Sequence, residues 1–156
     1  MLVNHRQNVR LSLISQRAPT WRQIESRASI IQYDGECFHV ALEQQDLPCS
    51  VDLTTERHET HQGIFWFDIS PYRVTMTMQS NSRLSYRHFW ETGIYGTSRY
   101  CLNSELNEKG QLIQLRNFTK QLHIVQSQTL EKVCIEYEVW SGPTLLGSYL
   151  MHLHID

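Results

Sequence analysis

The sequence predicts an all-β fold, an antiparallel meander that closes into a barrel with little or no helix. Apolar and polar residues alternate along most of the chain, the pattern of strands with one buried face. Turn-forming residues divide these stretches into about nine or ten short strands. No stretch of useful length has apolar residues at the helical i, i+3, i+4 spacing.

Closure of the sheet follows from the order of these strands. Sequential hairpins leave unprotected edge strands unless the sheet closes on itself, so a barrel is favoured over the alternative, a sandwich. The length of 156 residues is that of one domain, and we expect a single β-barrel domain over residues 1–156.

The N-terminal half is expected to contain four alternating strands, over 9–14, 21–33, 38–42 and 49–57. The dipeptide Asp34-Gly35 predicts a tight hairpin turn between the second and the third, because both positions tolerate positive φ.

The C-terminal part continues in the same way, with strands expected over 64–67, 72–79, 84–90, 94–102 and 111–125. The polar segment 103–110 is predicted to be the longest loop. The alternation slips near Arg116 and Asn117, which predicts a β-bulge at that point.

The last 24 residues predict a closing hairpin with its turn at Ser141 to Thr144. The expected buried face carries Val133, Ile135, Tyr137 and Val139 on the first arm, and Leu145, Gly147, Tyr149, Met151, Leu153 and Ile155 on the second. Such a hairpin is unstable alone, so the rest of the chain must cover its apolar face.

Composition excludes several classes of partner. The net charge of -2 comes from 14 basic and 16 acidic residues spread along the chain, so we expect neither nucleic acid nor membrane as a partner.

The N-terminus has no signal-peptide pattern and no run approaches the roughly 18 apolar residues of a membrane span, so a cytoplasmic protein is expected. The four scattered cysteines form no C-x-x-C pair and are expected to be free thiols.

The closing segment resembles the end of the YwiB-like family of small bacterial proteins. The resemblance rests on Glu-Tyr-Glu at 136–138 and Leu-Gly-Ser-Tyr at 146–149, and on Tyr95-Gly96-Thr97 as the family's upstream Tyr-x-Thr element. It implies a calycin-like barrel, of the lipocalin and fatty-acid-binding kind, in the bacterial cytosol. The family has no assigned activity, so the resemblance supplies no catalytic residue and no cofactor.

The first hypothesis for function is a non-enzymatic barrel that binds a small, partly apolar molecule inside. Aromatic and methionine side chains share the inward positions of the predicted strands, and a set of them is the candidate ligand site: Tyr72, Met76, Tyr86, Trp90, Tyr137 and Tyr149. The alternative is that these side chains fill the barrel completely. The inward tyrosine hydroxyls favour a pocket, because each needs a hydrogen-bond partner when it is buried.

The second hypothesis is a metal-assisted enzyme that uses His152 and His154, which project from one face of a strand. That face is opposite the apolar one, so both are expected to point to solvent. The segment His58-Glu59-Thr60-His61 is one residue too short for the zinc-protease motif His-Glu-x-x-His, and no Gly-x-Ser-x-Gly element occurs. We therefore predict no catalytic residue, no bound metal and no cofactor.

The third hypothesis is a structural or interaction module. In that case the outer surface or an edge strand would meet another protein or a second copy of the chain, as in a homodimer.

Overall fold

The computed structural model describes residues 3–16, 21–48, 60–80, 84–104 and 107–156. Every regular element in these ranges is a strand, which confirms the predicted all-β class. The strands are β1 (Val3–Ser15), β2 (Trp21–Asp34), β3 (Cys37–Pro48), β4 (Thr60–Ile69), β5 (Arg73–Ser80), β6 (Leu84–Glu91), β7 (Tyr95–Ser104), β8 (Asn107–Gln126), β9 (Leu130–Ser141) and β10 (Thr144–Ile155). None of the described residues belongs to a helix long and apolar enough to cross a membrane.

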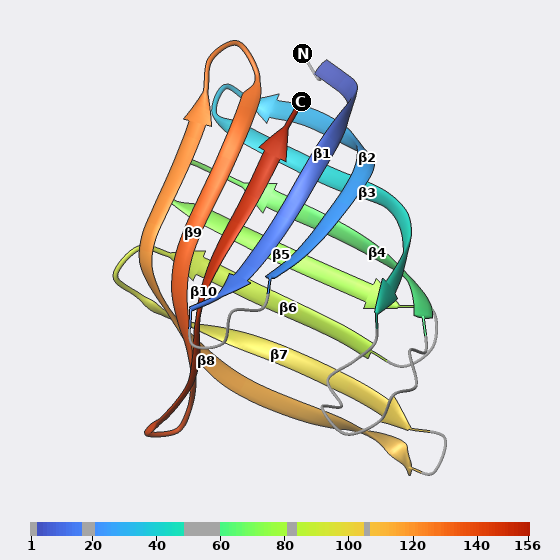
Figure 1. Cartoon of the computed structure of the whole chain (residues 1–156), viewed down its shortest axis with the longest axis vertical. Coiled ribbons are helices and arrows are strands. Elements are labelled where there is room, and N and C mark those ends of the chain that lie inside the picture. Colours follow the sequence, from blue (N-terminus) through green and yellow to red (C-terminus); the bar gives the residue numbers. More distant parts are fainter. Residues whose placement is uncertain (1–2, 17–20, 49–59, 81–83, 105–106) are drawn as a thin grey trace.

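The strands form one closed antiparallel barrel. Each strand pairs with its neighbours in sequence, and β1 pairs with β10 to complete the ring. The closing ladder runs from Val9 opposite Ile155 to Ser15 opposite Tyr149. As a result, the start of β1 and the end of β10 lie at the same end of the molecule (Figure 1). The predicted meander is confirmed, and the arrangement fits a calycin-like barrel.

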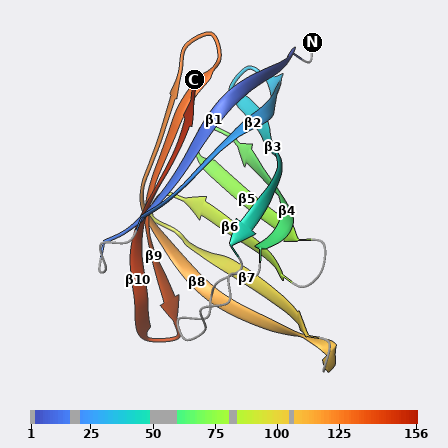
Figure 2. The same cartoon turned by 45° about the vertical axis from the view of Figure 1, so that its right-hand side comes forward.

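The strands cross the barrel in two main directions. In Figure 1, β1, β9 and β10 run steeply across the front, while β5, β6 and β7 cross behind them. The side view in Figure 2 shows the same two groups diverging from a common edge. The long strand β8 belongs to both, because its first part pairs with β7 and its second part pairs with β9.

The core lies inside the barrel and is built by the alternation that the sequence shows. Along β9, residues Val133, Ile135, Tyr137 and Val139 are buried, and the residues between them are partly exposed. Met151, Leu153 and Ile155 of β10 are buried in the same way. The predicted inward face of the closing hairpin is therefore confirmed except at Leu145. A register shift between Leu145 and Gly147 places Leu145 opposite Trp140, on the outward face. The hairpin turn is also confirmed, with Gly142 at a φ of 55°.

Several local predictions are corrected. Segment 103–110 is not a long loop, because the backbone is in strand conformation up to Ser104 and again from Asn107, and these two residues pair across the hairpin. Backbone pairing requires no apolar alternation, so sequence pattern missed it. The turn after β2 is centred on Gly35 and Glu36, one residue later than expected. The strand expected over 49–57 lies outside the described residues.

The predicted bulge is also displaced. Arg116 and Asn117 pair regularly with both β7 and β9, and the register shifts of β8 occur at Thr119/Gln121 and Val125/Gln126. The alternation slips at Asn117 because a polar side chain occupies an inward position, where it is fully buried. The irregularity that the sequence shows is thus a buried polar residue, and the backbone there is regular.

Candidate functional site

A buried polar network connects three strands on the inner side of the barrel wall. The Nδ1 atom of His88 on β6 lies 2.9 Å from the hydroxyl of Ser98 on β7. The Ser98 hydroxyl donates to Oδ1 of Asn117 on β8 at 2.9 Å. The Asn117 amide nitrogen then donates to the Phe89 carbonyl oxygen at 2.6 Å, which returns the chain of hydrogen bonds to β6.

The position of each proton in this network follows from the Phe89 carbonyl. That oxygen can only accept, so the amide nitrogen of Asn117 must face it and Oδ1 must face Ser98. The single Ser98 proton is then donated to Asn117. Consequently the Ser98 oxygen accepts from His88, which carries its proton on Nδ1. This is the reverse of a nucleophile and base pair, in which the imidazole would accept the serine proton.

Burial keeps His88 neutral. The residue is 5% exposed, and removal from water lowers the pKa of its imidazole from 6.5 to about 4. Its ring stacks on Trp90 with centroids 5.2 Å apart and an interplanar angle of 7°. Tyr86 packs edge-on at 5.3 Å, and Tyr137 lies at 6.3 Å from across the barrel.

Two polar atoms beside this aromatic cluster have no hydrogen-bond partner among the described residues. They are the indole Nε1 of Trp90 and the hydroxyl of Thr119, and both are buried. The Trp90 ring lies 5.2 Å from that of Tyr137, and Tyr137 is directly opposite Thr119 in the β8–β9 ladder. A donor and a hydroxyl thus occur in one region of the interior. The Trp140 indole nitrogen also has no partner there, but its strand position is outward.

Five of the six predicted ligand-site residues face the interior. Met76, Trp90 and Tyr137 are buried, and Tyr86 and Tyr149 pack against the core. The rings of Tyr137 and Tyr149 stack 5.5 Å apart, and Tyr86 meets Phe65 across the cluster. The structure therefore brings these side chains together; their role in binding stays a prediction.

Tyr72 is the exception, and its predicted inward orientation is wrong. Its side chain is 79% exposed. The residue lies just before β5, in a turn held by hydrogen bonds between the backbones of Ser70 and Arg73. The alternation seen at Val74 and Met76 does not extend into this turn.

His88, Ser98, Asn117 and Thr119 were not among the predicted site residues. The sequence did contain a sign of His88. It lies midway between Tyr86 and Trp90 in the two-residue alternation, so it is a polar residue at a predicted inward position. Ser98, Asn117 and Thr119 lie on two strands whose relative register had to be known before they could be placed together.

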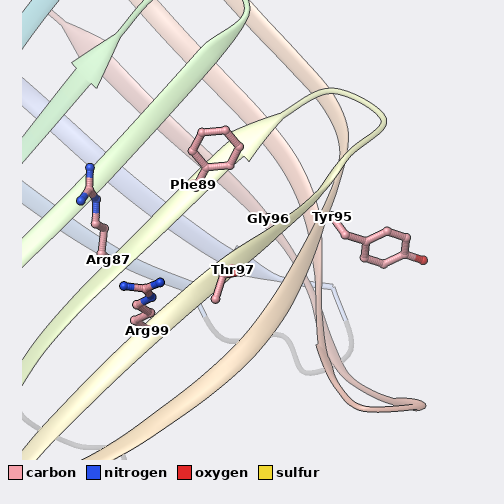
Figure 3. A pocket seen from close by; sticks show the side chains of 6 residues that line it. All are labelled: Arg87, Phe89, Tyr95, Gly96, Thr97 and Arg99. Atoms are coloured by element: carbon pink, nitrogen blue, oxygen red, sulfur yellow. The ribbon is translucent and has the colours of Figure 1, made fainter.

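On the outer side of this network, the hydrogen-bond ladder of the barrel wall is interrupted beside a surface pocket. The ladder between β6 and β7 stops at the pair Arg87 and Arg99, and beyond it Gly93 pairs with Thr119 of β8 instead. A pocket of about 380 Å³ lies at this place, lined by Arg87, Phe89, Tyr95, Gly96, Thr97 and Arg99 (Figure 3). His88 and Ser98 alternate with these residues along the same strands, so one layer of backbone separates the pocket from the network.

The histidines proposed for metal binding have separate partners. Nδ1 of His152 lies 3.8 Å from the Cys134 sulfur, and Nε2 of His154 lies 3.4 Å from Asp156. Both alternate with the buried Met151 and Leu153 and so project outward. Across the described part of the chain, no three His, Cys, Asp or Glu side chains gather as metal ligands would.

Most of the segment His58 to His61 cannot be placed relative to the other histidines. His58 and Glu59 lie outside the described residues, and the His61 side chain is not among those described.

These features define a closed ten-stranded antiparallel barrel with a polar network set into an aromatic interior. No family model matches the sequence, and no curated protein matches it. Among solved structures, the chain is similar to the crystal structure of the ywiB protein from Bacillus subtilis. The TM-score is 0.65 at 10% sequence identity, over 97% of this chain and 92% of that one. The predicted resemblance is thus supported for the fold, and membership of the YwiB-like family stays a prediction.

Proposed function

We propose that this chain is a non-enzymatic binding protein whose barrel interior takes a small, partly apolar molecule that carries a hydrogen-bond acceptor. The observation behind this proposal is the buried Trp90 Nε1–H, which has no acceptor among the described residues. The Thr119 hydroxyl, which also has no partner there, lies opposite Tyr137, a ring neighbour of Trp90.

The physical argument is the energy of an unmade hydrogen bond. A buried donor without a partner costs about 1–3 kcal/mol, so such groups are rare and each calls for an explanation, of which a bound molecule is one. Tyr137 packs at a tilt against Trp90 and stacks on Tyr149, so the three rings supply an apolar, aromatic surface. An acceptor on an aromatic or otherwise flat molecule would satisfy the indole while its body packs against these rings.

The proton arrangement supports binding over catalysis. The Ser98 hydroxyl is committed to Asn117, and His88 holds its proton on the nitrogen that faces Ser98. Ser98 is therefore not activated by this imidazole. The network ties together the three strands β6, β7 and β8, and β6 carries Trp90.

A neutral fluorescent probe tests the proposal. Nile red is apolar and planar and carries a carbonyl acceptor, and we expect it to bind the wild-type protein. Trp90→Phe removes the N–H and should weaken binding about three- to tenfold, the effect of one lost hydrogen bond. Trp140→Phe is the matched control, because its indole N–H is also unpaired but lies on the outward face; it should leave the affinity unchanged.

The natural occupant is sought by extracting the purified protein under denaturing conditions and analysing the extract by mass spectrometry. Tyr137→Phe and Tyr149→Phe should reduce the amount recovered without unfolding the barrel. An extract without any small molecule, together with Nile red affinity that Trp90→Phe does not change, would show that the interior is only a packed core.

A further inference from the structure

The outer pocket between β6 and β7 has a composition unlike that of the interior. Arg87 and Arg99 are directly opposite each other in the last pair of the β6–β7 ladder, and both are exposed. Figure 3 shows their side chains on the same side of the wall, near Thr97 and Phe89, with the Tyr95 ring directed away. The pocket thus contains two guanidinium groups and one hydroxyl.

Two like charges at a direct cross-strand position destabilise a sheet. Among the described residues, neither Arg87 nor Arg99 has an ion pair that would offset this repulsion. Local rules of this kind are broken mainly at functional sites.

The neighbouring arginines are held differently. Arg73 contacts Glu91 at 3.4 Å and lies over the Phe89 ring. Arg116 donates to the Gly142 carbonyl at 2.8 Å and lies over the Tyr95 ring. These contacts engage the side chains of Arg73 and Arg116, and the charge of Arg73 is balanced by Glu91.

We propose that this pocket is a binding site for a phosphate group, held between the Arg87 and Arg99 guanidiniums with the Thr97 hydroxyl as a further donor. The planar fork of arginine matches the oxygens of phosphate in a bidentate way, and a bound dianion would replace the repulsion between the two side chains by attraction. The volume of about 380 Å³ exceeds that of a bare ion and lies in the range of small-molecule sites. The site is on the opposite side of the wall from the interior, so it is independent of the proposed function.

Calorimetric titration of the full chain with inorganic phosphate, at constant ionic strength in chloride, tests the proposal. Wild-type protein should bind phosphate, and binding should weaken as salt is raised. Arg87→Gln and Arg99→Gln should each lower the affinity about tenfold or more, and the double variant should abolish binding. Arg27→Gln removes the same charge from an exposed site on β2 and should bind as wild type does.

Unfolding does not explain the expected loss, because each substitution removes a like-charge contact. The melting temperatures of Arg87→Gln and Arg99→Gln should equal or exceed that of wild type.

A parallel titration with adenosine 5′-monophosphate distinguishes the source of the phosphate. Tighter binding than inorganic phosphate assigns the site to a nucleotide, and equal binding assigns it to the phosphate group alone. No binding of either compound, or full binding by the double variant, would overturn the proposal.

Discussion

His88 is a neutral imidazole surrounded by aromatic rings in the wall of a barrel. Its burial favours the unprotonated state. Since the pKa of His88 falls from 6.5 to about 4 on folding, the unfolded chain binds the proton more tightly than the folded one. The stability of the barrel must therefore depend on pH in this interval.

The first prediction concerns this dependence. The contribution of His88 to the free energy of unfolding is complete above pH 6.5 and is lost as the pH falls toward 4. The full loss is about 3 kcal/mol. Urea denaturation across this range should show the decline in wild type and a smaller decline in His88→Gln. His5→Gln, at an exposed position, should retain the wild-type slope; an equal slope in His88→Gln would contradict the assignment.

The second prediction concerns Gly96, where a side chain has no room. A Cβ at this position would collide with the Phe89 carbonyl oxygen and come within 2.9 Å of the Phe89 ring. Gly96→Ala should destabilise the protein by about 1–3 kcal/mol, as overpacking does.

Gly35→Ala is the matched control for Gly96→Ala. A Cβ at Gly35 meets nothing within 4 Å, so its free energy of unfolding should stay within about 0.5 kcal/mol of wild type. Equal melting temperatures for the two variants would show that β6 and β7 separate freely at Gly96.

At the scale of elements, Asn117 holds three strands together where a ladder is missing. β6 and β7 stop pairing after Arg87 and Arg99, and the Asn117 side chain joins the Phe89 carbonyl to Ser98 at that place. A single polar side chain thus replaces backbone hydrogen bonds.

The third prediction follows from this role. Asn117→Ala leaves the Phe89 carbonyl and the Ser98 hydroxyl without this partner, and the cost is about 2–3 kcal/mol. Hydrogen exchange should accelerate in β6 and β7 before it does in β9. Asn4→Ala, which removes an exposed acceptor for Ser29, should change stability by less than about 0.5 kcal/mol. Uniform acceleration across all strands would argue against a local role.

The alternation of apolar and polar residues located most strands. It failed where the polarity of a side chain does not reflect the conformation of the backbone. A bulge was predicted near Asn117 because this residue is polar at an inward position. Tyr72 was predicted to face inward because it lies two and four residues before the inward Val74 and Met76. In both cases a period-two pattern describes side-chain polarity, and the backbone hydrogen bonds decide the structure. The polar pairing of Ser104 with Asn107 was missed for the same reason.

At the scale of the whole molecule, closure by β1 and β10 gives every described strand two neighbours. The ladder between β6 and β7 nevertheless stops at Arg87 and Arg99, so the edge-strand form of the interaction hypothesis stays a prediction. A closed sheet also has no terminal strand from which to unravel.

The fourth prediction tests the closing ladder. Leu153 is fully buried and lies opposite both Leu11 and Val133. Leu153→Ala should cost about 2–5 kcal/mol. Leu146→Ala on the same strand, at 49% exposure, should cost less than about 0.5 kcal/mol. Far-ultraviolet and near-ultraviolet circular dichroism should report one coincident transition; separate transitions would show that the barrel opens in parts.

The sequence by itself determined the all-β class, the meander order and the inward face of most strands. Alternation is a local property, since each strand must present its own apolar side to the core whatever lies opposite. Met76, Tyr86, Trp90, Tyr137 and Tyr149 were located in this way.

Only the tertiary structure decided which of these positions meet. Register and closure place His88, Ser98 and Asn117 within hydrogen-bonding distance from three different strands. They also gather Arg73, Arg87, Arg99 and Arg116 on one outer face, although the chain shows no basic run. Contacts between strands depend on the register of every strand pair in the closed barrel. No local pattern in the sequence specifies these registers.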